Sequence, residues 1–173
     1  MTRPTLSQLI ELLNLEPLTG EGGLFRQTWR SKEQLPEGFR PGAESKPVGT
    51  AIQYLITPRT FSRLHRLPTD EVYHFYLGDP VEMFLVSPQG EASFRILGQD
   101  LLGGMAVQTV VPAGWWQGSR LKEGGQWALV GTTMAPGYTD EDYEDADPSA
   151  MKEMLPQYAQ LIDLLTAPAG TEA

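Results

Sequence analysis

The chain has 173 residues, a formal net charge of -9 and no cysteine, so it can bury a sizeable core but has neither disulfides nor thiolate metal ligands. The negative charge argues against nucleic acid as a partner, and the lack of an apolar run of ~20 residues argues against a membrane span. We therefore expect a single domain over residues 1–173, located in the cytoplasm, with neither a nucleic acid nor a membrane as partner.

The first predicted element is a short amphipathic helix over residues 5–15. Leu6, Leu9, Ile10 and Leu13 recur there at helical spacing, and Pro17 closes the segment. Residues 19–29 are predicted to form a glycine turn that leads into a strand. Residues 33–47 are rich in proline and glycine, which predicts an exposed loop.

Short β-rich runs follow from residue 50, separated by turns that contain glycine or proline. They cover residues 50–57, 61–67, 71–78, 81–87, 92–98, 106–112 and 126–133. Short strands at this spacing predict an all-β sandwich or barrel. No long amphipathic helix lies between them, which argues against a parallel sheet.

The C-terminal segment is predicted to be helical over residues 148–166. Asp147 followed by Pro148 is a typical helix start, and Pro156 is expected to begin a second helix in which Tyr158, Ile162 and Leu165 share a face. The acidic run before it, residues 138–147, is predicted to be a solvated loop.

Residues 62–80 contain both histidines of the chain, His65 and His74, with Glu71 between them. If this stretch forms two strands joined by a turn at residues 67–70, Glu71 and Tyr73 share one face of the second strand and His74 lies on the other. His65 lies across the turn, beside Glu71. A pair of His65 and Glu71 is therefore geometrically easier than a triad that includes His74, for which a structural role is the stronger interpretation.

Two motifs in this part of the chain resemble those of cupins. Glu71, followed by Gly78, matches the end of the first cupin motif, and His65 lies near the place of its first histidine. The place of the second histidine falls on Arg66 or Leu67. The run PAGWWQ resembles the second cupin motif, with Gln117 where a histidine ligand belongs.

The resemblance is closer to the fifth cupin group, a family with a domain of unknown function, and extends from about residue 6 to 165. Five blocks carry it in order: GEGGLFRQTW, TAIQYLIT, SRLHRLPTDEVYHFYLGDPVEMFLV, VVPAGWWQGSRL and ALVGTTMAPGYTDEDYE. It implies a double-stranded β-helix, the cupin jelly-roll barrel, with short N- and C-terminal helices. The barrel core then covers residues 20–136, and the resemblance also implies a homodimer.

The donor set does not predict a resident metal. A transition metal prefers three or more nitrogen and oxygen ligands, whereas this chain offers two histidines on different faces, Glu71 and a neutral Gln117. We expect no cofactor, and weak binding of a divalent metal stays open.

A metal-free pocket is the preferred interpretation of the site. The predicted catalytic residues are His65 as the base, Glu71 as its partner and Tyr73 as an acid, with Tyr54 as the alternative acid. The predicted ligand contacts are Arg26 and Arg63 for an anionic group, Trp115 for a flat surface, and Tyr54, His74 and Gln117.

The predicted function is the binding of a small polar molecule in the barrel pocket. The site residues are also compatible with a metal-independent isomerase or epimerase that acts on a sugar- or nucleotide-like ligand. Two alternatives remain open from the sequence. One is a metal-dependent cupin enzyme such as a dioxygenase, and the other is a sensor that binds a small molecule without catalysis.

Overall fold

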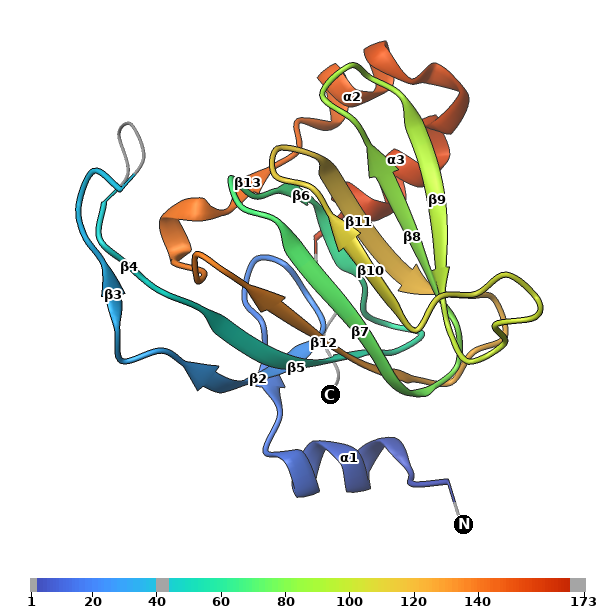
Figure 1. The fold of residues 1–173 in the computed structure, drawn as a ribbon. Helices are drawn as coiled ribbons and strands as arrows, with labels where there is room; N and C mark the ends of the chain where they lie inside the picture. The colour runs from blue at the N-terminus through green and yellow to red at the C-terminus, as the bar shows by residue number, and fades with distance from the viewer. Residues whose placement is uncertain (1–2, 40–43, 169–173) are drawn as a thin grey trace.

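Two antiparallel sheets face each other in the computed structural model, which describes residues 3–39 and 44–168 (Figure 1). The six-stranded sheet has the order β1 (Glu16–Pro17), β2 (Leu24–Arg30), β5 (Thr50–Ile56), β12 (Ala128–Met134), β7 (Glu71–Gly78) and β10 (Gln108–Val111). The five-stranded sheet has the order β13 (Glu144–Asp145), β6 (Ser62–Arg66), β11 (Trp116–Leu121), β8 (Val81–Val86) and β9 (Ala92–Leu97). This arrangement confirms the predicted all-β jelly roll.

The main core lies between the two sheets. Alternate residues of a strand point to the same face, so each strand contributes every second side chain to this layer. The six-stranded sheet supplies Tyr54, Tyr73 and Phe75, and the five-stranded sheet supplies Met83 and Leu85, all of them buried. Full burial of a side chain of this size contributes roughly 1.5–3 kcal/mol, so this layer is the main source of stability for the barrel.

Helix α1 (Leu6–Leu13) covers the outer face of the six-stranded sheet (Figure 1). Thr5 begins it with a capping box, in which its side chain accepts from the backbone N–H of Gln8 and the Gln8 side chain accepts from the Thr5 N–H. Leu9 packs against Leu24 and other apolar residues of the sheet. The helix ends at Leu13, before Pro17, at which the sequence predicts that the segment closes. It ends there because Asn14 adopts a left-handed conformation with a φ of 48°.

The C-terminal helices cover the outer face of the five-stranded sheet. They are α2 (Pro148–Met154), the short 3-10 helix η2 (Pro156–Tyr158) and α3 (Ala159–Thr166), and they lie within residues 148–166. Asp147 caps α2 by accepting from the backbone N–H of Ser149. Ile162 and Leu165 bury themselves against Leu64 and Phe84 of the sheet.

The strand predictions agree with the structure except at β11 and at the two-residue strands β1, β3 (Gln34–Leu35), β4 (Lys46–Pro47) and β13. Each of the seven predicted runs contains a strand, and β2 follows the glycine turn as expected. Strand β11 lies outside those runs. The predicted loop over residues 33–47 contains a small hairpin of β3 and β4, while residues 40–43 lie outside the described part of the chain.

The predicted hairpin over residues 62–80 is wrong, because its two strands belong to different sheets. Strand β6 pairs with β11 and β13, and β7 pairs with β12 and β10. The turn between them crosses from one sheet to the other. It is held by the backbone N–H of Gly114, which donates to Leu67 O, and that of Ala113, which donates to the Asp70 carboxylate.

The prediction of a solvated loop for residues 138–147 is also wrong in part. This segment contains the 3-10 helix η1 (Asp140–Asp142) and strand β13, which pairs with the edge of β6. Asp142 is buried and forms an ion pair with buried Lys46, which explains why an acidic residue can leave solvent here.

Within the described residues, no helix is long and apolar enough to cross a membrane.

Candidate functional site

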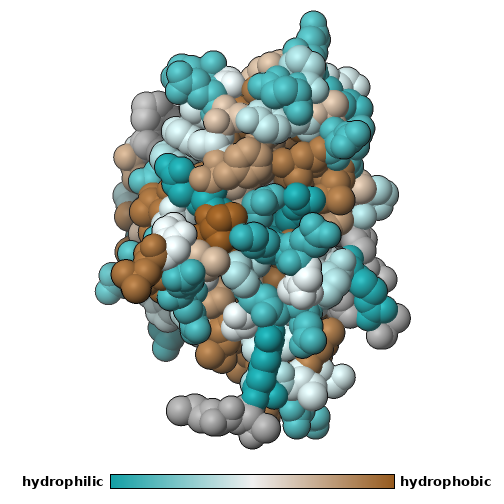
Figure 2. All heavy atoms as spheres, turned by 90° about the vertical axis from the view of Figure 1, so that its right-hand side faces the viewer, coloured by the Kyte–Doolittle hydropathy of each residue, from teal (hydrophilic) through white to brown (hydrophobic). Residues whose placement is uncertain are grey.

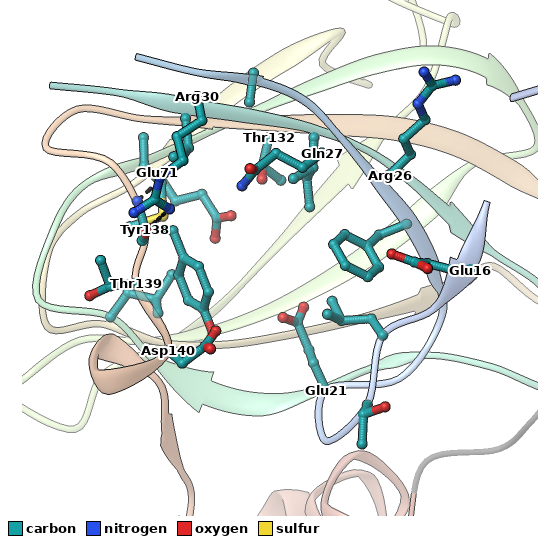
Figure 3. Close-up of a pocket in the computed structure, with 18 of the residues that line it drawn as sticks. Glu16, Glu21, Arg26, Gln27, Arg30, Glu71, Thr132, Tyr138, Thr139 and Asp140 are labelled. Carbon is teal, nitrogen blue, oxygen red and sulfur yellow. Dashed lines mark hydrogen bonds between the residues drawn. The ribbon is translucent and has the colours of Figure 1, made fainter. Parts of the chain in front are cut away.

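A cavity of about 710 Å³ opens between the six-stranded sheet and the acidic segment 138–141 (Figure 3). Its wall includes the inner face of β2 and β5, the turn before β2 and the ends of β7 and β12. The residues that line it are Glu16, Leu18, Thr19, Glu21, Phe25, Arg26, Gln27, Arg30, Thr50, Ala51, Ile52, Leu67, Glu71, Thr132, Met134, Tyr138, Thr139, Asp140 and Glu141.

Glu71 is the one predicted catalytic residue that lines this cavity. It is the first residue of β7, it is 7% exposed, and its Oε2 accepts a hydrogen bond of 2.8 Å from Gln117 Nε2. Burial raises the pKa of its carboxyl group, and the nearby charge of Glu21 raises it further. His65 and the hydrogen bonds from Thr132 and Gln117 oppose this shift. Glu71 therefore holds a proton more readily than an exposed glutamate.

His65 lies behind Glu71 rather than in the cavity wall. An irregularity in the pairing of β6 with β11 brings Ser62 opposite Ser119 and His65 opposite Gln117, so both β6 side chains face inward. His65 is 1% exposed, and its ring stacks on Tyr143 at a centroid distance of 4.8 Å. Its Nδ1 lies 2.7 Å from Arg63 O and must carry the hydrogen, because a carbonyl oxygen only accepts.

Gln117 joins the two predicted catalytic residues. It neighbours His65 across the strands and donates to Glu71. The structure thus brings His65, Gln117 and Glu71 together, as the sequence predicts, although they come from both sheets.

The two predicted acid tyrosines are buried in the barrel core and are not among the residues that line the cavity. The Tyr54 hydroxyl donates to Gly22 O at 2.8 Å. Burial raises the pKa of both phenols, and Glu21 near Tyr54 and Glu71 near Tyr73 raise these pKa values further. Both phenols therefore stay protonated, and neither lines the cavity.

His74 lies on the opposite face of β7, as strand alternation predicts. Its ring hydrogen-bonds with Thr133 Oγ1 at 3.2 Å and with Gln108 Nε2 at 3.1 Å. These partners are on the neighbouring strands β12 and β10, so the structure does not bring His74 into the cavity with Glu71.

Trp115 and Trp116 lie on opposite sides of the five-stranded sheet. Trp115 packs against the core between the sheets, whereas Trp116 packs with the C-terminal helices. The guanidinium group of Arg66 covers the Trp116 ring at 4.6 Å from its centroid. Neither tryptophan lines the cavity.

The predicted arginine contacts are directed elsewhere. Arg26 forms part of the wall, but its guanidinium group donates to Leu13 O at 3.2 Å and points away from the cavity in Figure 3. Arg63 donates to Gly20 O at 3.1 Å and lies 3.3 Å from the Asp145 carboxylate. Its polar contacts therefore tie the turn before β2 to β13.

Arg30, rather than the predicted Arg26, is the arginine of β2 that is directed into the cavity. The pairing of β2 with β5 shifts between Gln27 and Trp29, so Arg30 pairs with Thr50 and joins the inner face. Its Nη1 donates to Tyr138 O at 3.4 Å. Simple alternation from Phe25 puts Arg30 on the outer face, so the sequence carries no signal that reveals this position.

Glu21 and Tyr138 are two further wall residues that sequence reasoning missed. Glu21 accepts a hydrogen bond of 2.7 Å from Ser62 Oγ, and its carboxylate points toward the centre of the cavity in Figure 3. Burial and the charges of Asp140 and Glu21 raise the pKa of Tyr138. Tyr138 belongs to the acidic run over residues 138–147, and the high charge of this run is the sequence feature that points to it as part of the pocket wall.

The residues at the cupin metal positions do not fit a transition metal. Over residues 3–39 and 44–168, no three histidine, cysteine, aspartate or glutamate side chains form a group that could hold a metal ion. Gln117 stands at the position of a cupin histidine ligand, and its amide nitrogen donates a hydrogen bond to Glu71. The Oε1 atom of Gln117 has no hydrogen-bond partner within the described residues. A neutral amide oxygen with one imidazole and one carboxylate is a weak donor set for such an ion.

Comparison with known proteins assigns the family. Residues 7–146 match the model of the Cupin_5 family, described as cupin superfamily (DUF985). The chain belongs to this cupin family. The resemblance seen in the sequence is thereby confirmed.

Several relatives share the fold of this cupin over nearly its whole length. The crystal structure of protein SO0799 from Shewanella oneidensis is 31% identical with a TM-score of 0.83, covering 96% of this chain and 99% of that one. A hypothetical protein from Leishmania major is 26% identical with a TM-score of 0.84, covering 94% of this chain and 98% of that one.

Two other matches cover less of this chain or of the matched protein. The uncharacterized protein YML079W of Saccharomyces cerevisiae is 28% identical over 134 residues, which span 71% of this chain and 66% of that protein. Oxalate decarboxylase from Bacillus subtilis, described with Mn(II) centres, is 13% identical with a TM-score of 0.54, covering 88% of this chain and 38% of that one. At this identity the likeness concerns the fold alone.

Proposed function

We propose that this cupin binds a small polar molecule in the cavity and catalyses a metal-independent proton transfer on it, of the isomerase or epimerase type. The observation that carries the proposal is Glu71, a buried carboxyl group at the cavity wall with a raised pKa. Buried polar side chains are normally saturated by internal partners, whereas Glu71 also faces a space large enough for a ligand. A pKa moved toward neutrality suits a group that both takes up and releases a proton.

The proposed step needs one base and one acid on opposite sides of the ligand. The Glu71 carboxylate removes a proton from a carbon next to a carbonyl group, and the electron pair of the C–H bond moves into that carbonyl to form an enolate. The Tyr138 hydroxyl, which stays protonated because its pKa is raised, returns a proton to the other side of the same carbon. Solvent then moves the proton from Glu71 to Tyr138, and the configuration of the carbon is inverted without a cofactor.

His65 has a supporting part in this proposal. It contacts neither the cavity nor the ligand, but its interaction with Glu71 favours the charged carboxylate that accepts the proton. Gln117 holds the same carboxylate through its amide hydrogen bond. The predicted roles of base and partner are therefore exchanged between His65 and Glu71.

The test has two stages. A thermal-shift screen of sugars, sugar nucleotides and nucleotides first selects compounds that stabilise the protein, because a ligand of the native state raises its melting temperature. The selected compounds are then incubated with the protein in deuterated water, and the loss of their carbon-bound hydrogen is followed by NMR.

We expect wild type to exchange this hydrogen and Glu71→Gln to bind the compound but to exchange it at least about a hundredfold more slowly. Glu123→Gln, which changes an exposed residue and has the same effect on net charge, serves as the control. Equal exchange by Glu71→Gln would disprove the role of Glu71. Binding without exchange in wild type would instead identify a non-catalytic binding module.

A further inference from the structure

We infer that the ligand of this cavity carries a positively charged amino group. The inference rests on the proposed function, because it concerns the same cavity, and it specifies the class of molecule that the cavity takes. Five carboxylate side chains line the cavity: Glu16, Glu21, Glu71, Asp140 and Glu141. The basic side chains that line it are Arg26 and Arg30, so acidic groups outnumber basic ones by five to two.

The excess of negative over positive charge directed into the cavity is larger than the ratio of five to two suggests. The guanidinium group of Arg26 donates to Leu13 O at the end of α1 and points away from the cavity (Figure 3). This leaves Arg30 as the basic group directed inward from the described wall residues. Even if Glu71 is protonated, four acidic residues line the cavity against one guanidinium group directed inward, so an anionic ligand would enter a region of like charge.

The cavity carboxylates also lack ion-pair partners among the described residues. Within residues 3–39 and 44–168, no lysine or arginine forms an ion pair with any of the five. Glu21 and Glu71 instead accept from the neutral donors Ser62 and Gln117. These two carboxyl groups also repel each other, since the charge of Glu21 raises the pKa of Glu71. A bound ammonium group would relieve this repulsion and supply the missing donors.

The tyrosines around the cavity respond to the same negative field. Carboxylate charges raise the pKa values of Tyr54, Tyr73, Tyr138 and Tyr143, in addition to the effect of burial. The field thus reaches the six-stranded sheet and the acidic run over residues 138–147.

Aromatic rings complete a surface that suits an ammonium group. Phe25 from β2 and Tyr138 from the acidic segment both line the cavity. The negative face of an aromatic ring attracts a cation, and carboxylates beside it add charge-assisted hydrogen bonds. A neutral sugar would use only the hydrogen bonds, whereas an amino sugar or a simple aromatic amine would use both.

The test compares amines with alcohols of the same shape on the full-length protein. Glucosamine and glucose form one matched pair, benzylamine and benzyl alcohol form the second, and inorganic phosphate is the anionic probe. Binding is followed by NMR through the backbone amide signals of Phe25, Arg30 and Tyr138, which report on the cavity even when affinity is low. We expect at least one amine to bind about tenfold or more tightly than its alcohol, as charged hydrogen bonds predict.

Isosteric variants assign the preference to the cavity. Glu21→Gln keeps an oxygen that can accept from Ser62 but removes the charge, and Asp140→Asn removes a second one. We expect the double variant to lose most of the preference for the amine, while the exposed control Glu123→Gln retains it.

The outcomes separate this inference from the proposed function. If the alcohols or phosphate shift the cavity signals as strongly as the amines, the inference is wrong and cavity binding stands. If amines bind but the deuterium exchange fails, the inference stands and the catalytic proposal is wrong. If no probe shifts the cavity signals, the inference is wrong, and the thermal-shift screen and deuterium exchange decide the proposed function separately.

Discussion

Glu71 is a buried glutamate with a raised pKa, and its titration should be visible in the stability of the protein. Burial and the charge of Glu21 raise its pKa in the folded chain above the ordinary value of a glutamate. The folded state therefore binds the proton more tightly than the unfolded state. The stability that this group contributes is complete below its unfolded pKa and is lost as pH rises through its folded pKa.

We predict that Glu71→Gln is more stable than wild type at neutral pH and that its stability depends less on pH above about 4.5. The neutral amide avoids the burial of a charge next to Glu21. Urea unfolding at a series of pH values measures both effects. If wild type and variant give the same slope against pH, Glu71 does not titrate with a raised pKa.

Gln117 is the residue that replaces a metal ligand, so restoring histidine there should change metal binding. Gln117 neighbours His65 and contacts Glu71, so a histidine at this position brings a third donor to one place. We predict that Gln117→His binds zinc or cobalt more tightly than wild type, measured by calorimetric titration of untagged protein. A wild-type affinity equal to that of the variant would contradict the conclusion that His65, Glu71 and Gln117 are a weak donor set for a transition metal.

The acidic segment 138–141 forms one wall of the cavity, and the buried ion pair of Lys46 with Asp142, the next residue, holds it in place. Lys46 donates to Asp142 and, at 3.1 Å, to Thr139 Oγ1, and both charged side chains are at least nine-tenths buried. Loss of one partner leaves the other charge buried and unpaired, which typically costs about 3–5 kcal/mol.

We predict that Lys46→Met lowers the free energy of unfolding by about 3–5 kcal/mol, measured by urea unfolding. The double variant Lys46→Met with Asp142→Asn removes both charges and should recover most of it, since asparagine can still accept from the Thr139 N–H. If the double variant is no more stable than Lys46→Met, the unpaired charge is not the cause of the loss.

Helix α3 offers a matched pair of adjacent leucines. Leu165 is 1% exposed and packs on the five-stranded sheet, whereas Leu164 is 42% exposed. We predict that Leu165→Ala costs about 2–5 kcal/mol of unfolding free energy and that Leu164→Ala changes it by no more than about 0.5 kcal/mol. Equal effects of the two substitutions, measured by urea unfolding, would mean that α3 does not anchor the sheet through this face.

The elements of the fold were largely predictable because they depend on local patterns. The cap at Asp147, the helical spacing of Leu6, Leu9 and Leu13, and the glycine and proline turns between strands are all visible in the sequence. Strand alternation also placed Glu71 and His74 on opposite faces of β7 correctly.

The details of the site were less predictable because they depend on pairing between distant strands. Arg30 enters the cavity through a shift in the register of β2 with β5, and Ser62 shares the inner face with His65 through a similar shift in β6. Such irregularities leave no mark on the residues themselves. The burial of Asp142 likewise depends on Lys46, which is distant in sequence and looked like part of an exposed loop.

The whole molecule presents exposed apolar side chains around its β10 edge. Leu101, Leu102, Val107 and Val110 are all more than one-third exposed, and Figure 2 shows hydrophobic side chains among hydrophilic ones on the face at the right of Figure 1. Apolar surface of this kind is typical of contacts between proteins.

We expect a homodimer, as the cupin resemblance implies, and predict that sedimentation velocity finds about twice the mass of one chain. Val110→Lys should shift the equilibrium toward the monomer if this face takes part, because it would bury an unpaired charge. A wild-type protein that sediments as a monomer at all concentrations would contradict the prediction.

The most direct test of the central proposal is a crystal structure of the protein with the tightest-binding compound from the thermal-shift screen. We predict that the compound lies between β2 and the acidic segment, within hydrogen-bond distance of the Glu71 carboxyl group. A compound bound outside this cavity, or inside it but out of reach of Glu71, would contradict the proposal.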